Sequence, residues 1–140
     1  MVSSLKRRKV GDIMSKEVVT VSLDAPIKEV LDLMTLNGIT AIVVVDEKGY
    51  SSGLISSFDV VGLFNTHSLE EIEGLKARDV MTKHVIDVDP KDTLDKAAKI
   101  MREFRVHRLV VLGSGKPGKQ KPIGILSTGD MVSFLNTQIG

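Results

Sequence analysis

The heptapeptide GILSTGD, Gly124 to Asp130, has an earlier twin in GLISSFD, Gly53 to Asp59. Both read glycine, two apolar residues, serine, two spacers and aspartate. Apolar residues after a glycine are typical of a short strand, and Ser-x-x-Asp before an apolar run is typical of a helix start. Each heptapeptide therefore predicts a strand-to-helix corner that carries a hydroxyl and a carboxylate.

Such a corner has two chemical interpretations. Backbone N–H groups at a helix start point outward, and beside a hydroxyl and a carboxylate they suit a ligand with hydroxyls and anionic groups. Alternatively, the serine caps the helix while the aspartate reaches back to the serine amide, which forms a capping box without any ligand. A single corner does not separate these interpretations.

The two corners belong to a longer internal duplication. Asp12 and Met14 recur 67 positions later as Asp79 and Met81, and after the second predicted turn the offset becomes 71. Twelve first-half residues recur identically on these offsets: Asp12, Met14, Lys16, Val18, Val21, Met34, Val43, Val44, Gly53, Ser56, Asp59 and Val61. The four added residues fall within GSGKPGKQK, residues 113–121, where a surface loop tolerates an insertion.

Apolar periodicity predicts the same order in each half: strand, helix, strand, turn, strand, helix. In the first half a β-branched strand centres on Thr20, and Asp24 and Gly38 are candidates for the cap and the stop of the helix that follows. The apolar stripe of that helix consists of Ile27, Val30, Leu31 and Met34. The apolar run ITAIVVV, residues 39–45, predicts a strand that is buried on both faces.

These elements divide the chain into a basic arm (residues 1–9), two repeats (10–64 and 77–136), a connector (65–76) and a tail (137–140). In the connector, Ser68 and the glutamates after it predict a short helix that Gly74 ends. A three-stranded repeat of this size is marginally stable alone. We therefore expect the two halves to bury their sheet faces against each other in an α/β (α+β) pseudo-two-fold disc, with both corners at the shared seam.

The composition excludes several classes of function. Lys and Arg total 19 and Asp and Glu 18, so a formal net charge of +1 gives no support to nucleic-acid binding. The chain has no cysteine, and its three histidines are not at metal-ligand spacing. No apolar run approaches the roughly 20 residues that span a bilayer, and the N-terminus lacks an apolar signal core. We therefore expect a cytoplasmic protein without a membrane partner.

The openings GDIMS (11–15) and ARDVMT (77–82), together with the two corners and the duplication, resemble the CBS domain, which is named after cystathionine β-synthase. The resemblance covers about residues 10–136, as a tandem pair or Bateman module. VHRLVVL (106–112), followed by GILSTGD, is similar to the adenine-nucleotide-binding repeats in the γ subunit of AMP-activated protein kinase. The resemblance thus implies a CBS-pair disc that binds an adenine nucleotide.

The resemblance also implies roles for individual residues. The carboxylates of Asp59 and Asp130 would hold ribose hydroxyls through charge-assisted hydrogen bonds. His107 and Arg108 would face nucleotide phosphates, since a guanidinium matches phosphate geometry. The other positions implied to line the ligand, at the corners, the first strands and the heads of the second strands, are Thr20, Ile39, Thr40, Ala41, Ser56, Ser57, Asp87, Val106, Ser127 and Thr128.

The two halves differ at the positions that would meet phosphate. Thr40 and Ala41 stand where the second half has its His-Arg pair, so the first repeat supplies no cation there. Asp87 stands where the first half has Thr20, and its carboxylate would repel phosphate or meet ribose hydroxyls. We therefore expect two unequal sites at most, and the sequence leaves open which cleft Arg108 serves.

The residues and the resemblance together favour a stand-alone regulatory sensor. Its regulatory ligand would be AMP, ADP, ATP or a relative of S-adenosylmethionine, with no cofactor, and a separate effector protein would receive the signal. Catalysis is not expected, because the sequence offers no nucleophile–base pair, metal cluster or phosphate-cradling glycine loop. A homodimer is expected, since small discs with exposed apolar helix faces pair by two-fold symmetry. The alternative is an interaction module whose corners are only capped helices.

Overall fold

The computed structural model of the 140-residue chain describes residues 5, 7–83 and 86–139. Lys6, which belongs to the predicted basic arm, lies outside this described part. None of the helices within the described ranges combines the length and apolarity that a membrane span requires.

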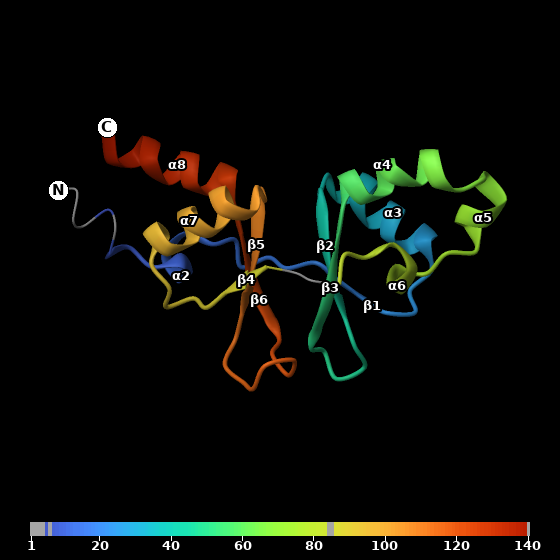
Figure 1. Cartoon of the computed structure of the whole chain (residues 1–140), viewed down its shortest axis with the longest axis horizontal. Coiled ribbons are helices and arrows are strands. Elements are labelled where there is room, and N and C mark those ends of the chain that lie inside the picture. Colours follow the sequence, from blue (N-terminus) through green and yellow to red (C-terminus); the bar gives the residue numbers. More distant parts are fainter. Residues whose placement is uncertain (1–4, 6, 84–85, 140) are drawn as a thin grey trace. The chain divides into compact units, whose positions relative to one another are not determined.

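The chain divides into two compact units. Unit 1 contains Met1–Val18 and Ile86–Gly140, and unit 2 contains Val19–Val85. Each unit has one three-stranded sheet packed with helices, which confirms the predicted mixed α/β class and element order (Figure 1). The units do not coincide with the sequence repeats, because the opening of each repeat belongs to the unit that the other repeat builds.

Unit 2 has a sheet of order β1-β2-β3. β1 and β2 are parallel, with α3 as their crossover, whereas β2 and β3 form an antiparallel hairpin. The elements are β1 (Thr20–Ser22), α3 (Ile27–Asn37), β2 (Ala41–Val45), β3 (Ser51–Ser56), α4 (Ser57–Thr66), α5 (Leu69–Glu73) and α6 (Ala77–Val80). The helices cover one face of the sheet, where Ile42, Val44 and Ile55 form the core with Val30 (Figure 1).

Unit 1 repeats this plan with the order β4-β5-β6 and the same parallel and antiparallel pairings. Its elements are α2 (Val10–Ile13), β4 (Asp87–Val88), α7 (Leu94–Phe104), β5 (Arg108–Leu112), β6 (Pro122–Ser127) and α8 (Thr128–Ile139). Leu109, Val111 and Leu126 pack against the helices. The two similar halves of the sequence therefore form two sheets with the same strand order and pairing.

The helix ends follow from local chemistry. α3 stops at Gly38 as predicted, with a φ of 62° that glycine adopts without strain. Arg105 takes the equivalent position after α7 with a φ of 53°. The prediction of Asp24 as a cap is wrong, because Pro26 occupies the N-cap position. Asp24 instead accepts a hydrogen bond from the Arg78 guanidinium at 2.7 Å.

The middle strand of each sheet is buried on both faces, as the run at residues 39–45 predicted. Ile42, Val43 and Val44 in β2 are at most 1% exposed, and residues 109–111 in β5 are equally buried. Consecutive side chains of a strand point to opposite faces, so burial of neighbours requires cover on both sides. Each corner thus follows a strand, β3 or β6, that pairs with the buried middle strand.

The opening of repeat 2 packs against the corner glycine of repeat 1, within unit 2. Thr82 and Leu54 form an antiparallel bridge with N···O distances of 2.8 and 3.1 Å. Met81 covers Gly53 so closely that a Cβ on this glycine would lie 2.6 Å from the methionine sulfur. The first glycine of GLISSFD is therefore required by the close approach of the opening segment.

Unit 1 contains the reciprocal contact, made by the opening of repeat 1. Ser15 bridges Ile125, and Met14 covers Gly124, where a Cβ would lie 2.5 Å from the sulfur. The methionines of the two openings are partly buried against the cores. The opening of each repeat thus packs against the corner of the other repeat.

The connector contains the predicted short helix. The Ser68 hydroxyl accepts a hydrogen bond from the Glu71 amide at 3.2 Å, and the Glu71 carboxylate accepts one from the Ser68 amide at 2.8 Å. Gly74 follows the last turn of this helix. At the other end of the chain, α8 continues to Ile139. The expected tail is therefore helical over residues 137–139, since no glycine or proline interrupts residues 131–139.

Candidate functional site

The first corner lies in unit 2, where β3 ends at Ser56 and α4 begins at Ser57. Oδ2 of Asp59 accepts hydrogen bonds from the Ser56 amide at 2.8 Å and from the Ser56 hydroxyl at 3.0 Å. The Asp59 amide donates to Ser56 Oγ at 3.3 Å. The corner is a capping box, with the geometry that the ligand-free interpretation predicts.

The second corner, in unit 1, has the same geometry. The Ser127 amide donates to Asp130 Oδ2 at 2.8 Å, and the Asp130 amide donates to Ser127 Oγ at 3.1 Å. The capping bonds of both corners use Oδ2 of the aspartate, and both aspartates are half-buried. Capping therefore does not exclude contact with a ligand at the other carboxylate oxygen.

Thr82 is a corner residue that the sequence reasoning missed. Its hydroxyl donates to Oδ1 of Asp59 at 3.3 Å. Thr82 ends the opening ARDVMT, and Ser15 ends the corresponding opening GDIMS. A signal was present in the sequence, because both openings end in a hydroxyl residue, but nothing in a linear pattern indicates that this hydroxyl meets the corner of the other repeat.

In unit 2, the predicted strand residues share one face of the sheet. Ala41 pairs with Ser56 across β2 and β3. Thr20 pairs with Val43, two residues beyond Ala41, so its side chain has the same orientation. This face is opposite the one that packs against the helices. The structure thus brings Thr20, Ala41 and the first corner onto one surface of unit 2.

In unit 1, the equivalent face carries charge. Arg108 pairs with Ser127, and Asp87 pairs with Val110, two residues beyond Arg108. These residues alternate with the core residues, so a cation, a carboxylate and the second corner lie on one face. Arg108 is half-buried and His107 is exposed. Unit 1 therefore combines hydroxyl, carboxylate and guanidinium groups, whereas unit 2 lacks the guanidinium at the equivalent position.

The heads of the second strands are committed to local hydrogen bonds. The amides of Ile39 and Val106 donate to the last turns of α3 and α7 at 3.2 and 3.1 Å. The carbonyl of Thr40 accepts from the Ser57 amide at 2.9 Å, and the His107 carbonyl accepts equivalently in unit 1. These backbone groups fix each corner beside its strand head.

The fourteen predicted positions thus fall into two sets, each within one unit. The set in unit 2 consists of Thr20, Ile39, Thr40, Ala41, Ser56, Ser57 and Asp59. The set in unit 1 consists of Asp87, Val106, His107, Arg108, Ser127, Thr128 and Asp130. That the two sets face one common seam stays a prediction.

Comparison with known proteins identifies the repeats. The family model of the CBS domain matches residues 10–65 and 77–137. The chain belongs to the CBS-domain family. Its two CBS repeats place the corners, openings and strand heads described above at equivalent positions in both halves.

Curated relatives share this pair as part of longer proteins. The chain is 31% identical over 126 residues to the 5'-AMP-activated protein kinase subunit gamma-3 of Sus scrofa, a match that covers 86% of the chain and 24% of the relative. It is 32% identical over 134 residues to the homoserine O-acetyltransferase of Methanosalsum zhilinae, covering 94% of the chain and 24% of the relative. The chain spans about a quarter of both, so the likeness concerns the CBS pair.

Solved structures agree with the assignment. The structure of CBSX2 in complex with AMP matches with a TM-score of 0.79 and 26% identity, and the match covers 95% of this chain and 99% of that one. The fold and its connectivity are therefore those of a CBS pair, two three-stranded sheets with their helices.

The carboxyl group of Asp87 has a shifted pKa. Partial burial raises this pKa above its ordinary value of 3.8, because desolvation disfavours the charged form. The folded CBS pair thus binds the Asp87 proton more tightly than the unfolded chain does. This tighter proton binding therefore stabilises the folded state at low pH, and the stabilisation is lost as pH rises through the shifted pKa of Asp87.

We accordingly expect Asp87→Asn to stabilise the CBS pair slightly at pH 7, by up to about 0.5 kcal/mol, since the carboxylate is still partly exposed and screened. The gain should shrink as pH falls through about 4, because the carboxyl group then becomes protonated in both states. Urea unfolding of both proteins between pH 3.5 and 7.5 measures this. The control Glu103→Gln removes an exposed carboxylate from α7, so a trend that both variants share does not come from Asp87. Equal stability of Asp87→Asn and wild type at every pH would contradict the assignment.

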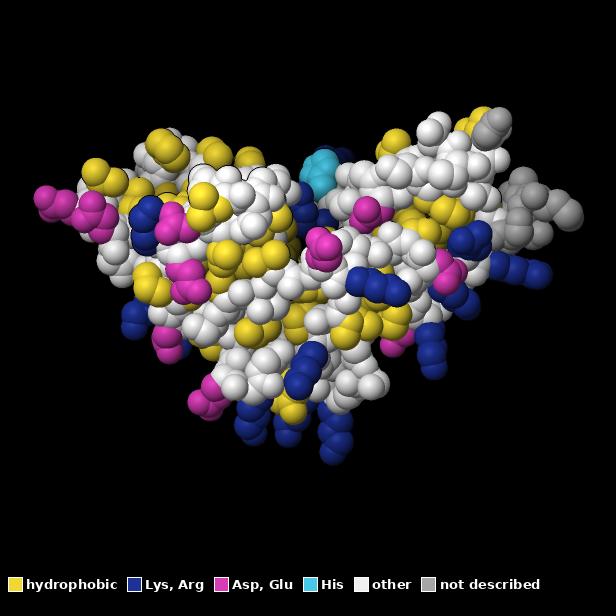
Figure 2. All heavy atoms as spheres, turned by 180° about the vertical axis from the view of Figure 1, so that it is seen from behind, with side chains coloured by type: hydrophobic (Ala, Val, Ile, Leu, Met, Phe, Trp, Pro, Cys, Tyr) yellow, Lys and Arg dark blue, Asp and Glu magenta, His cyan; other side chains and the backbone are white. Residues whose placement is uncertain are grey.

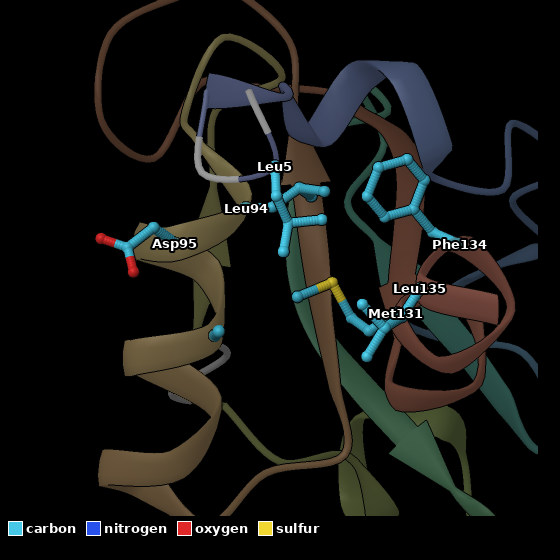
Figure 3. Close-up of a pocket in the computed structure, with 7 residues that line it drawn as sticks. Leu5, Leu94, Asp95, Met131, Phe134 and Leu135 are labelled. Atoms are coloured by element: carbon cyan, nitrogen blue, oxygen red, sulfur yellow. The ribbon is translucent and has the colours of Figure 1, made fainter. Parts of the chain in front are cut away.

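A separate apolar groove lies in unit 1 between α7 and α8 (Figure 3). Its volume is about 280 Å³, and its apolar lining consists of Leu5, Leu94, Ala98, Met131, Phe134 and Leu135. The Asp95 carboxylate at its margin points away from the groove (Figure 3). None of the predicted ligand-binding residues lines this groove, which we call the α7–α8 groove.

Proposed function

We propose that this CBS pair is a regulatory module that binds an adenosine-containing ligand, most simply AMP, ADP or ATP. The observation that carries the proposal is the polar face of unit 1. There Arg108 lies opposite the corner residue Ser127 in the β5–β6 register, on the sheet surface opposite the core. The AMP complex of the related CBSX2 supports the same ligand class. The bound nucleotide would bias the shape of the module for an effector protein.

The chemistry of each ligand part matches a group on this face. A ribose presents neighbouring hydroxyls, and Oδ1 of Asp130, which takes no part in the capping bond to the Ser127 amide, is a charge-assisted acceptor for them. The guanidinium of Arg108 suits phosphate, and the exposed His107, which directly precedes β5, offers a ring N–H as a further donor. Oδ2 of Asp130 already holds the helix start, so ligand binding would use the carboxylate without breaking the capping box.

The two corners would differ in affinity. The site in unit 2 has Thr40 and Ala41 at the strand head in place of the His-Arg pair, and its Asp59 already accepts from Thr82 through Oδ1. A nucleotide there would meet a hydroxyl-rich surface with no cation from this strand. We therefore propose that unit 1 supplies the phosphate contacts of the tighter site.

Calorimetric titration tests this function. AMP, ADP and ATP should bind, and adenosine should bind more weakly because it lacks phosphate. Arg108→Ala should weaken AMP binding at least about tenfold, the loss of one charge-assisted hydrogen bond, and leave adenosine binding unchanged. Arg102→Ala on α7 is the matched control and should bind AMP like wild type. No heat and no melting shift with any adenosyl compound, S-adenosylmethionine included, at millimolar concentration would overturn the proposal.

The capping boxes favour a second candidate function. The serine and the aspartate of each corner already hydrogen-bond to each other, so the capping box forms without a ligand. A CBS pair of this kind would act only as a homodimerising interaction module, through the apolar side chains that its helices expose. The same titration separates the two candidates, and we propose a homodimer under both.

A further inference from the structure

The connection between β5 and β6 in unit 1 is a surface feature that neither the corners nor the groove uses. It consists of residues 113–121, GSGKPGKQK, which we call the lysine loop. The equivalent connection between β2 and β3 in unit 2 consists of residues 46–50, DEKGY. The four added residues of the second repeat therefore lengthen this connection. They also change its charge, from one Lys against an Asp and a Glu to three Lys without an acid.

The sequence around the lysine loop is free of acidic residues. Residues 104–129 contain five Lys and Arg and no Asp or Glu. Asp89 follows the neighbouring strand β4, but its carboxylate accepts the Lys91 amide of its own loop at 2.8 Å. Figure 2 shows Lys and Arg side chains projecting from the lower edge of the view, where the tip of the β5–β6 connection lies in Figure 1. The lysines of the loop are all exposed: Lys116, Lys119 and Lys121.

Hydrogen bonds and a glycine give the lysine loop a defined turn. The Gln120 side-chain amide donates to the Gly113 carbonyl at 2.8 Å, and the Gly113 amide donates to the Lys121 carbonyl at 2.9 Å. Gly115 has a φ of 146°, and a Cβ there would lie 2.6 Å from the Lys119 carbonyl oxygen. Only glycine fits such a close backbone approach. The lysine side chains therefore start from a built turn, which lowers the entropy that is lost when they bind a partner.

We propose that the lysine loop is a docking surface for an acidic segment of a partner protein. The proposal rests on the effector protein of the proposed function and names the surface that would hold it. A lysine ammonium group is a point charge on a flexible stem. Three such groups on one loop can follow the unevenly spaced carboxylates of an extended acidic segment. Charge complementarity of this kind favours fast and reversible association, which suits a regulatory contact.

Other anionic partners match the lysine loop less well. Residues 113–121 contain no aromatic ring on which a nucleic-acid base could stack and no arginine for bidentate contact with phosphate. Residues 114–119 at the tip contain no Leu, Ile, Val, Met or aromatic side chain that would enter a lipid surface. The net charge of +1 gives the chain no long-range attraction for a long polyanion. A short acidic protein segment is therefore the partner that the loop fits.

Fluorescence anisotropy with a labelled octaglutamate peptide tests this docking surface. Wild type should bind the peptide in about 0.05 M NaCl, and about 0.3 M NaCl should weaken binding at least about fivefold, because salt screens exposed charges. Neutralising the loop should weaken binding at least about tenfold in a triple variant with Lys116→Gln, Lys119→Gln and Lys121→Gln. The matched control removes the same charge from other exposed positions of unit 1 and should bind like wild type, with Lys91→Gln, Lys96→Gln and Lys99→Gln.

Three outcomes would overturn the proposal. The first is the absence of peptide binding by wild type at about 1 mM protein. The second is an equal loss of binding in the loop variant and in the control. The third is tighter binding of a twelve-nucleotide thymidine oligomer, or of phosphatidylserine vesicles, than of the peptide, which would assign the loop to nucleic acid or to lipid instead.

AMP titration of the loop variant keeps this test separate from the ligand hypothesis. The lysine loop precedes β6 and the corner follows it, so the two lie at opposite ends of this strand, and the loop variant should bind AMP like wild type. If wild type binds the peptide but no adenosyl compound, the ligand hypothesis fails and the docking surface stands. If the loop variant loses AMP binding, the lysines act at the corner, and the docking surface is wrong.

Discussion

Replacing Gly53 with alanine is expected to lower the free energy of unfolding by about 1–3 kcal/mol, the range typical of an extra methyl group in a packed interior. The added Cβ would lie 2.6 Å from the Met81 sulfur and 2.9 Å from the Thr82 carbonyl oxygen. The sulfur is near the end of a flexible side chain and can move. The carbonyl accepts the Leu54 amide hydrogen bond of the bridge, so moving it weakens the attachment of the opening segment.

Gly62 supplies the matched control for this substitution. It lies inside α4, and a Cβ added there has nothing within 4 Å. Gly62→Ala should therefore raise stability by up to about 1 kcal/mol, because alanine is the better helix former. In urea denaturation, the midpoint of Gly53→Ala should therefore lie below that of wild type and the midpoint of Gly62→Ala above it. Equal midpoints for Gly53→Ala and wild type would show that Met81 and Thr82 do not approach the corner glycine as described.

The alanine variant of Gly124 is expected to behave like that of Gly53. Its Cβ would meet Met14 and the Ser15 carbonyl at 2.5 and 3.0 Å. Because the two glycines serve reciprocal contacts in different units, their effects should add within about 0.5 kcal/mol in the double variant. The pair of variants thus tests the exchange of opening segments in both units.

Much of the fold could be predicted because its signals are local and occur twice. The helical stripe around Val30, the continuous apolar run of β2 and the glycine stop of α3 each depend on neighbours in sequence. The duplication then transferred the strand and helix assignments to the second half, where Arg105 rather than a glycine follows α7. The capping boxes at Ser56 and Ser127 follow from the same local spacing, and the structure has them in both corners.

Contacts between distant segments could not be predicted in this way. Asp24 matched the sequence pattern of a helix cap, yet its partner is Arg78, which lies 54 residues later. The hydroxyl of Thr82 reaches Asp59 only because the openings are exchanged between the repeats, and periodicity within one repeat carries no information about that. The α7–α8 groove is lined by Leu5 together with side chains of α7 and α8, which are far apart in the sequence.

Asp130→Asn is expected to weaken AMP binding about 10- to 100-fold while changing the free energy of unfolding by less than about 1 kcal/mol. The asparagine carbonyl can still accept the Ser127 amide hydrogen bond, so the capping box keeps its backbone contact. What is lost is the negative charge, which costs the helix start a few tenths of a kcal/mol and the ribose contact about 1.5–3 kcal/mol. Asp130→Ala should lose the same affinity and about 1 kcal/mol of stability as well.

The comparison of ligands decides whether the carboxylate touches the sugar. With 2',3'-dideoxy-AMP, which lacks both ribose hydroxyls, wild type and Asp130→Asn should bind equally, since the group that the aspartate contacts is gone. The equivalent Asp59→Asn should change AMP affinity less, because unit 2 lacks the arginine of the tighter site. If Asp130→Asn weakens AMP and the dideoxy compound by the same factor, the carboxylate acts only through the helix. If it weakens neither, the aspartate is a cap and the ligand binds elsewhere.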